Sequence, residues 1–376
     1  MAFTSKAVVL PHLLAAAAII GCGENQPPII EESEHLILRG PSDVAVCGGT
    51  FPHMESEVIL IRLLFGGSSS PVDYAWMPES HFGADEFPCS SSGYACSFDR
   101  NVYARTLVST HELVHASRHS IPSVLEEALA EFLDAPMSAD ADILAPREEL
   151  WEAFERGWLN VAFTYGLYQR AAHFISFLVD SEGFDEFVEF EARLQSLDGA
   201  KDASFERWKS VFEDVYGESF GETWAAYENY PDCSPAQFHR PLSACAALGE
   251  RVPEATLTPA FATAPDPGSI FERELDCGQD SIYGPIVDGV PPSRASLHVV
   301  EINNPLATSV WVSLTGEIND GGFAILTNCG SCWEGAGVLV SHDAPKVLVN
   351  LESGTYALVL GQALKSSGEV GIAFSY

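Results

Sequence analysis

Hydrophobic residues recur at helical spacing through much of the first two thirds of the chain. Apolar positions three or four residues apart, in stretches free of Gly and Pro, predict amphipathic helices. These helices are expected over residues 55–65, 102–118, 147–156, 168–179, 184–194, 205–215 and 220–227. Other stretches favour strands, namely 35–39, 44–47 and 74–77, the last as a sheet edge beside a cleft. Strands followed by helices predict an α+β domain, which we place at residues 34–248.

The pattern changes in the last third of the chain. A segment rich in Pro, Ala and Thr, residues 249–269, has the composition of a linker. Short apolar runs separated by turns follow it, at 296–302, 309–314, 322–327, 346–351, 356–360 and 370–375. Several short strands at this spacing predict a β-sandwich domain over residues 270–376.

The N-terminus has the proportions of a secretory signal. Lys6 precedes an apolar run over residues 7–20, which is too short to span a bilayer. The sequence Ile19-Ile20-Gly21-Cys22 resembles the bacterial lipobox, in which the cysteine is lipidated and becomes the mature N-terminus. The resemblance implies a signal peptide over 1–21, lipidation of Cys22, a tether over 22–33 and a membrane-anchored lipoprotein of the cell envelope. The alternative is ordinary cleavage nearby, with Cys22 in a disulfide.

Eight further cysteines give an even number, which in an exported chain predicts a disulfide framework. Sequence proximity favours Cys89 with Cys96 and Cys233 with Cys245. The partners of the other four stay open: Cys47, Cys277, Cys329 and Cys332. The last two form a C-x-x-C motif, which in an exported protein favours structural bridges over redox chemistry or zinc binding.

The charge balance limits the partners. Fifty-three acidic residues against nineteen basic ones give a formal charge of −34. A surface this acidic repels nucleic-acid phosphates and anionic lipids, so we expect no nucleic-acid binding and membrane attachment through the lipid anchor alone.

The stretch His111-Glu112-Leu113-Val114-His115 carries the most chemistry. Two histidines four residues apart lie on one face of a helix, so both imidazoles can reach one metal ion. Glu112 lies beside them, where it can accept a proton from water. This is the HExxH arrangement of zinc hydrolases. A helix over 102–118, N-capped by Asp99 or Asn101 and ended by Ser120-Ile121-Pro122, would carry the motif.

The third ligand comes from the segment that follows. Residues 125–132 read Leu-Glu-Glu-Ala-Leu-Ala-Glu-Phe. With HExxH, this segment resembles the gluzincin metallopeptidases, whose second helix reads apolar-x-Glu-Gly-apolar-Ala-x-aromatic and supplies the third zinc ligand. The resemblance places that ligand at Glu127, with Ala128 in place of the usual Gly. Glu126 is the rival ligand, because helical periodicity does not decide between the two. Glu131 is either a group that orients a ligand histidine or a solvated carboxylate.

The resemblance implies a zincin-like domain with a mostly helical C-terminal part, a zinc ion held by His111, His115 and Glu127, and Glu112 as general base. The region around Tyr168 resembles the family helix that supplies a tyrosine donor to the oxyanion, with His173 as a second candidate. We therefore expect a zinc metallopeptidase that acts on peptides or proteins.

Two other functions stay open. The chain could be an inactive surface-binding protein that keeps a peptidase fold and recognises its partner through the β-sandwich. The metal could also be purely structural. Three protein ligands argue against the structural reading, because they leave one position open for water.

Overall fold

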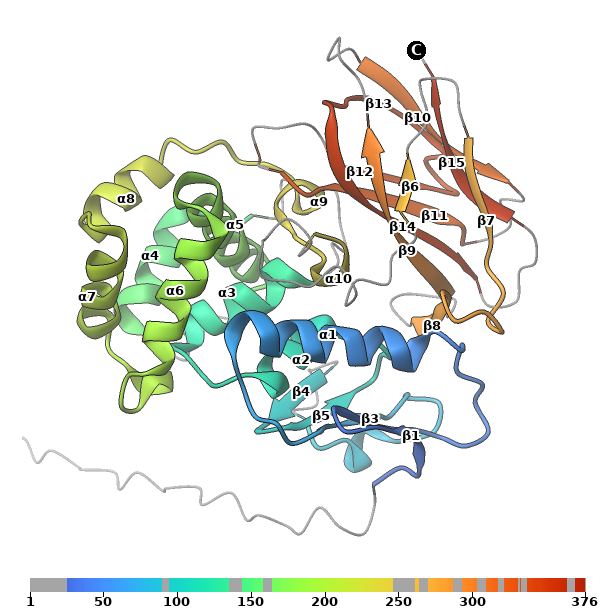
Figure 1. Cartoon of the computed structure of the whole chain (residues 1–376), viewed down its shortest axis with the longest axis horizontal. Coiled ribbons are helices and arrows are strands. Elements are labelled where there is room, and N and C mark those ends of the chain that lie inside the picture. The colour runs from blue at the N-terminus through green and yellow to red at the C-terminus, as the bar shows by residue number, and fades with distance from the viewer. Residues whose placement is uncertain are drawn as a thin grey trace, which may run out of the picture.

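In the computed structural model, the described residues are 26–89, 95–134, 144–157, 164–245, 261–263, 270–286, 293–302, 309–316, 321–330, 332, 337–363 and 369–375. Within them the chain is mixed α and β. One sheet lies near the N-terminus, helices occupy the middle of the chain, and two sheets lie toward the C-terminus (Figure 1). The predicted signal peptide and Cys22 lie outside the described residues.

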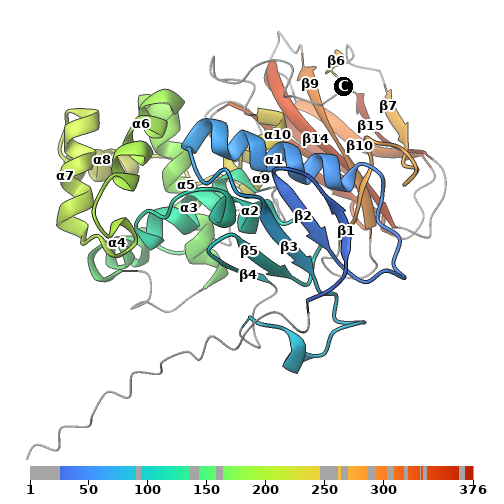
Figure 2. The ribbon, with the colours of Figure 1, turned by 60° about the horizontal axis from the view of Figure 1, so that its bottom comes forward.

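The N-terminal sheet runs in the order β1-β2-β3-β5-β4. Its central strands β2, β3 and β5 are parallel, and β1 and β4 are antiparallel edge strands. Helix α1 (Thr50–Phe65) connects β2 to β3 and lies along one face of the sheet (Figure 2). The strands are β1 (Ile29–Glu32), β2 (Leu36–Arg39), β3 (Val72–Trp76), β4 (Ala95–Phe98) and β5 (Asn101–Ala104).

Several strand predictions need correction. Residues 44–47 form no strand, and residues 74–77 belong largely to the central strand β3 instead of a sheet edge. The end of the predicted tether forms strand β1, which pairs with β2. Short apolar stretches do not reveal their neighbours in a sheet, so their position in the strand order could not be read from the sequence.

The helix predicted over 102–118 is too long. Residues 102–104 belong to β5, where Val102 and Ala104 are fully buried. Helix α2 (Thr110–Ser117) begins after Ser109, whose hydroxyl accepts a hydrogen bond from the Glu112 backbone N–H, so neither Asp99 nor Asn101 is the cap. A segment without Gly and Pro can form a strand as well as a helix. Residues 102–104 form a strand because they pair with β3 and β4.

The remaining helices form one core with α1, α2 and the N-terminal sheet. The helices α4 and α8 have the predicted bounds, and α6 and α7 extend beyond theirs by one residue each. Helix α5 is longer by three residues at each end, and α1 begins five residues earlier than predicted. The bounds are α3 (Ser123–Leu133), α4 (Arg147–Arg156), α5 (Tyr165–Glu182), α6 (Phe184–Gln195), α7 (Phe205–Tyr216), α8 (Phe220–Tyr227), α9 (Pro235–Phe238) and α10 (Leu242–Cys245), with short 3-10 turns at Ala84–Glu86 and Ala200–Asp202.

The C-terminal part consists of two sheets, ordered β13-β10-β15-β7 and β12-β11-β14-β9-β6, with β8 paired to β9. Val312 and Ile372 of the first sheet share one core with Leu326 and Leu358 of the second, which is the arrangement of a β-sandwich. The strands are β6 (Phe261–Thr263), β7 (Ile270–Glu274), β8 (Tyr283–Ile286), β9 (Ser293–Ile302), β10 (Ser309–Gly316), β11 (Phe323–Asn328), β12 (Val338–Ser341), β13 (Lys346–Asn350), β14 (Gly354–Ala363) and β15 (Glu369–Ser375). The sequence pattern missed β6, β7, β8 and β12.

Three of the four disulfides connect distant parts of the chain. Cys89 pairs with Cys96 as predicted, but the predicted Cys233–Cys245 bridge is wrong. The bridges are Cys47–Cys277, Cys233–Cys332 and Cys245–Cys329, so both cysteines of the C-x-x-C motif form structural bridges. Helix α10 packs against the second sheet, where Cys245 and Cys329 share a small core with Val299 and Ala357. Four disulfides are typical of proteins that leave the reducing cytoplasm.

None of the helices described here combines the length and the hydropathy needed to cross a membrane.

Backbone contacts join the segment before α1 to the segment around β8. The Cys47 N–H donates to the Gly284 carbonyl at 2.9 Å, and the Gly49 N–H donates to the Ile282 carbonyl at 2.9 Å. A Cβ atom at Gly49 would lie 2.4 Å from the Asp280 carbonyl oxygen, so only glycine allows this approach. The segment before β8 is therefore held firmly against the start of α1.

Candidate metal centre

The local sequence places the HExxH residues on a short helix that enters from a tight turn. Val108 has a φ of 66°, unusual for a β-branched residue, and this turn brings Ser109 to the N-cap of α2. The Thr110 hydroxyl donates a hydrogen bond of 2.9 Å to Glu57 on α1, which anchors the first turn of α2. His111 and His115 then lie one helical turn apart and face α3.

Three donor atoms from α2 and α3 meet at one point. His111 Nε2 lies 3.2 Å from His115 Nε2 and 3.2 Å from Glu127 Oε2. His115 Nε2 lies 3.3 Å from the same Glu127 oxygen. We call these three atoms the donor triangle. The structure thus brings together the three residues predicted as ligands, and the triangle uses Glu127 rather than Glu126.

The outer nitrogens of both histidines face other carboxylates of α3. His111 Nδ1 lies 3.2 Å from Glu131 Oε2, and His115 Nδ1 lies 3.3 Å from Glu126 Oε1. When Nδ1 donates its proton to a carboxylate, the lone pair of Nε2 is directed into the triangle. The structure places Glu131 where the orienting alternative expects it. Glu126, weighed in the sequence only as a rival ligand, takes the equivalent position behind His115.

The charges of the site are strongly coupled. Burial lowers the pKa of both histidines, but the carboxylates outweigh it. Glu127 and Glu131 bring the pKa of His111 well above its ordinary value, and Glu127 and Glu126 raise the pKa of His115 to about 9. Burial raises the pKa of Glu127, but the two histidines lower it well below its usual range. The site is therefore built to hold positive charge at the triangle.

Tyr168 lies beside the triangle, and Glu112 follows His111 directly on α2. The Tyr168 ring packs edge-on against His111, with ring centroids 6.0 Å apart. Burial raises the pKa of Tyr168, and the carboxylates of Glu127, Glu131 and Glu112 raise it further, so the phenol keeps its proton at neutral pH. Glu112 is 9% exposed and is near enough to Tyr168 and to Tyr74 to raise the pKa of both. The catalytic roles of Glu112 and Tyr168 stay predictions.

His173, the second candidate for the oxyanion donor, lies elsewhere. Its Nδ1 is 3.0 Å from the Tyr227 hydroxyl, and its Nε2 is 3.0 Å from the Pro231 carbonyl oxygen. Both ring nitrogens are engaged in the core between α5 and α8, so His173 cannot serve the triangle. His119, which follows α2, is exposed and also lies apart from it.

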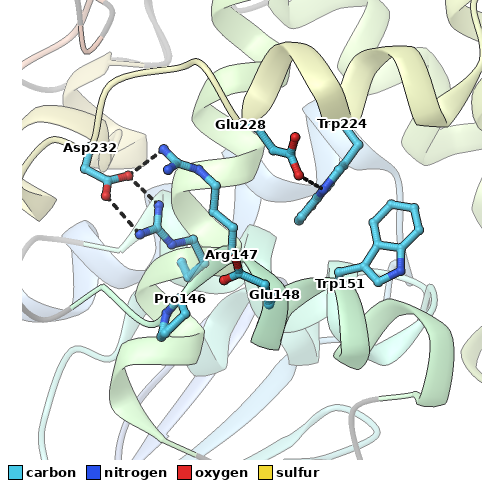
Figure 3. A pocket seen from close by; sticks show the side chains of 8 residues that line it. Pro146, Arg147, Glu148, Trp151, Trp224, Glu228 and Asp232 are labelled. Carbon is cyan, nitrogen blue, oxygen red and sulfur yellow. Dashed lines mark hydrogen bonds and ion pairs between the residues drawn. The ribbon is translucent and has the colours of Figure 1, made fainter.

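A surface pocket of about 710 Å³ lies between α4, α5 and α8 and contains none of the predicted site residues. Asp232 binds the guanidinium group of Arg147, and Glu228 accepts a hydrogen bond from the Trp224 indole (Figure 3). Asp232 also binds the guanidinium group of Arg170. Arg170 follows Tyr168 by two positions, so the two side chains leave α5 on nearly opposite sides. The pocket is therefore separated from the donor triangle by α5.

No protein-family model matches the chain, and no curated protein matches it. Among solved structures, the chain is similar to an aminopeptidase A of Legionella pneumophila, crystallised with aspartic acid, at 10% sequence identity and a TM-score of 0.35. The match covers 92% of this chain but 36% of that protein, so this chain spans about a third of its length. A likeness at this level does not establish a shared fold.

Proposed function

We propose that this chain is a zinc-dependent metallopeptidase of the gluzincin type, with a zincin-like catalytic domain, anchored outside the cytoplasm through a lipidated Cys22. One observation carries the enzymatic part of the proposal. The edges of the donor triangle measure 3.2, 3.2 and 3.3 Å. Ligand atoms about 2.0–2.1 Å from a tetrahedral zinc ion lie about 3.3–3.4 Å from one another. The arrangement of the side chains therefore fits the ion.

The chemistry of the donors supports the same choice. Two imidazole nitrogens and one carboxylate oxygen form a ligand set typical of catalytic zinc, while calcium and magnesium prefer oxygen ligands alone. The carboxylates behind both histidines fix the ring orientation that such a site needs. Other first-row metals bind similar donors, so the identity of the ion belongs to the proposal.

When bound, zinc acts as a Lewis acid that acidifies water and polarises a carbonyl group. The residues of the chain supply the remaining steps. Glu112 accepts the proton of the attacking water and returns it to the nitrogen of the departing amine. The Tyr168 hydroxyl donates a hydrogen bond to the carbonyl oxygen as negative charge develops there. His111, His115 and Glu127 would hold the ion.

The experiment that tests this proposal is a comparison of wild type with Glu112→Gln. Both proteins should bind zinc equally, because Glu112 is not a ligand, but the variant should lose hydrolysis of a peptide library. Glu149→Gln, an exposed substitution on α4, is the matched control and should leave both properties unchanged. Wild type that binds zinc but cleaves no peptide, or a variant that cleaves as well as wild type, would refute the peptidase assignment.

A further inference from the structure

A buried chain of hydrogen bonds continues behind Glu131, away from the donor triangle. It passes from Glu131 on α3 to Gln169 on α5 and then to His239, which directly follows α9. Gln169 and His239 are fully buried, and Glu131 is 9% exposed. Burying an amide and an imidazole costs free energy unless both are hydrogen bonded. Apolar side chains would fill this part of the core without that cost.

The first link fixes the Glu131 carboxylate from two sides. The Gln169 side-chain amide donates a hydrogen bond to Glu131 Oε1. The other carboxylate oxygen, Oε2, lies 3.2 Å from His111 Nδ1. A carboxylate held at one oxygen only could rotate about its own axis. With Gln169 in place, the second oxygen stays directed at His111.

The second link holds Gln169. Gln169 Oε1 lies 2.9 Å from His239 Nε2, and His239 Nδ1 lies 3.1 Å from the carbonyl oxygen of Asp134, at the end of α3. A neutral ring donates to one of these two oxygens, and a protonated ring donates to both. Burial lowers the pKa of His239, and the Glu131 carboxylate opposes that shift.

The same segment also closes the end of the helix that carries Glu127. The Arg240 backbone N–H donates a hydrogen bond of 2.7 Å to the Phe132 carbonyl oxygen. The His239 ring contacts the carbonyl oxygen of Asp134. The last carbonyl groups of a helix have no partner within the helix, so these two bonds supply what α3 lacks. Residues 239–240 therefore hold the C-terminal end of α3 as well as the side chain of Glu131.

We propose that Gln169 and His239 are positioning residues of the metal centre, which hold Glu131 in the orientation that fixes the His111 ring. The inference rests on the proposed metal site for its functional meaning. Both side chains are fully buried, and their hydrogen bonds lead to the donor triangle through Glu131, so both act through Glu131. Partners behind a metal ligand typically change metal affinity by roughly 10–100-fold when removed.

His173 provides a matched control on the same helix as Gln169. It is also fully buried, and both of its ring nitrogens are engaged, with the Tyr227 hydroxyl and the Pro231 carbonyl. His173→Phe should therefore cost stability in the way that His239→Phe does. It should leave zinc affinity unchanged, because no hydrogen bond connects His173 to Glu131.

The experiment measures two quantities in His239→Phe, Gln169→Leu and His173→Phe. The first is zinc affinity, determined by competition with a chelator. The second is the NMR signal of the His111 Nδ1–H in metal-free protein, which reports the hydrogen bond to Glu131 directly. We expect roughly a 10-fold or larger loss of affinity, and loss or fast exchange of the signal, in the first two variants only. Equal losses in His173→Phe, or no change in the first two, would overturn the proposal.

Two further comparisons keep the result interpretable. Where an apolar substitution prevents folding, Gln169→Asn and His239→Gln keep polar groups in the core and should show smaller losses of the same kind. In a Glu131→Gln background, His239→Phe should weaken zinc binding no further, whereas additive losses would contradict the proposal. If wild type binds no zinc, the metal site itself fails, and the His111 signal in metal-free protein still decides the positioning role.

Discussion

Two clusters in the described residues bring three possible metal-binding groups close together, and they differ in how their donor atoms are used. In the donor triangle of His111, His115 and Glu127, carboxylates behind the histidines leave Nε2 directed inward. In the cluster of His173, Cys233 and Cys332, the two sulfurs form a disulfide and the imidazole nitrogens bind Tyr227 and Pro231. Proximity of suitable residues is thus insufficient, because a ligand also needs a free lone pair and a partner that orients it.

The largest expected effect separates chemistry from metal binding. Glu112→Gln should lower peptide hydrolysis by roughly 10²–10⁴-fold, because a positioned general base contributes about that much. Zinc content should stay at the wild-type level. Steady-state kinetics and metal analysis on the same preparation give both numbers. Loss of zinc together with activity would instead make Glu112 part of the ligand set.

The next effect separates the two neighbouring carboxylates of α3. Glu127→Ala removes a corner of the donor triangle and should abolish stable zinc binding. Glu126→Ala removes only the partner of His115 Nδ1 and should weaken binding by roughly 10–100-fold. Chelator competition measures both affinities. A reversed order would move the ligand to Glu126 and contradict the geometry of the triangle.

A third test addresses the second cluster. The double variant Cys233→Ser, Cys332→Ser removes a bridge that spans 99 residues. The free energy of unfolding should fall by about 2–5 kcal/mol, as when a native disulfide is lost. Zinc content should not change, because this cluster offers the metal no free donors. Thermal denaturation and metal analysis provide the check, and a loss of zinc in folded protein would show that the clusters are coupled.

The smallest expected effect is a difference between the pKa values of His115 and His173, one from each cluster, in metal-free protein. Carboxylates outweigh burial and raise the pKa of His115 to about 9, while burial lowers the pKa of His173 to about 3. Protonated His115 should stabilise the fold fully below the pKa of an unfolded histidine, about 6.5, with this stability lost as the pH rises toward 9. His173 should act oppositely, losing its contribution as the pH falls from about 6.5 toward 3. NMR titration of the histidine rings between pH 5 and 9 should show His115 changing and His173 constant.

The sequence predicted the two histidines of the donor triangle because their spacing is set by local geometry. Two histidines four apart on a helix face the same way whatever surrounds them. The choice of Glu127 over Glu126 came from the family pattern, and the structure adds that Glu126 faces the outer nitrogen of His115. That role depends on the rotation of α3 against α2, which a helical pattern alone does not define.

Other features were set by contacts distant in sequence and could not be predicted. The first part of the expected helix became β5 because two neighbouring strands pair with it. Cys233 and Cys245 are close in sequence, but each pairs with a different cysteine of the segment that follows β11. His239 lies 70 residues beyond Gln169 and gave no local pattern that would connect it to the metal centre.

The measurement that tests the central claim most directly is the zinc content of the purified chain after reconstitution and removal of excess metal, with His111→Ala measured beside it. The donor triangle predicts about one tightly bound zinc ion per wild-type chain, and none in His111→Ala once that variant is shown to be folded. Wild type without zinc, or a folded His111→Ala chain that retains it, would contradict the metal centre described above.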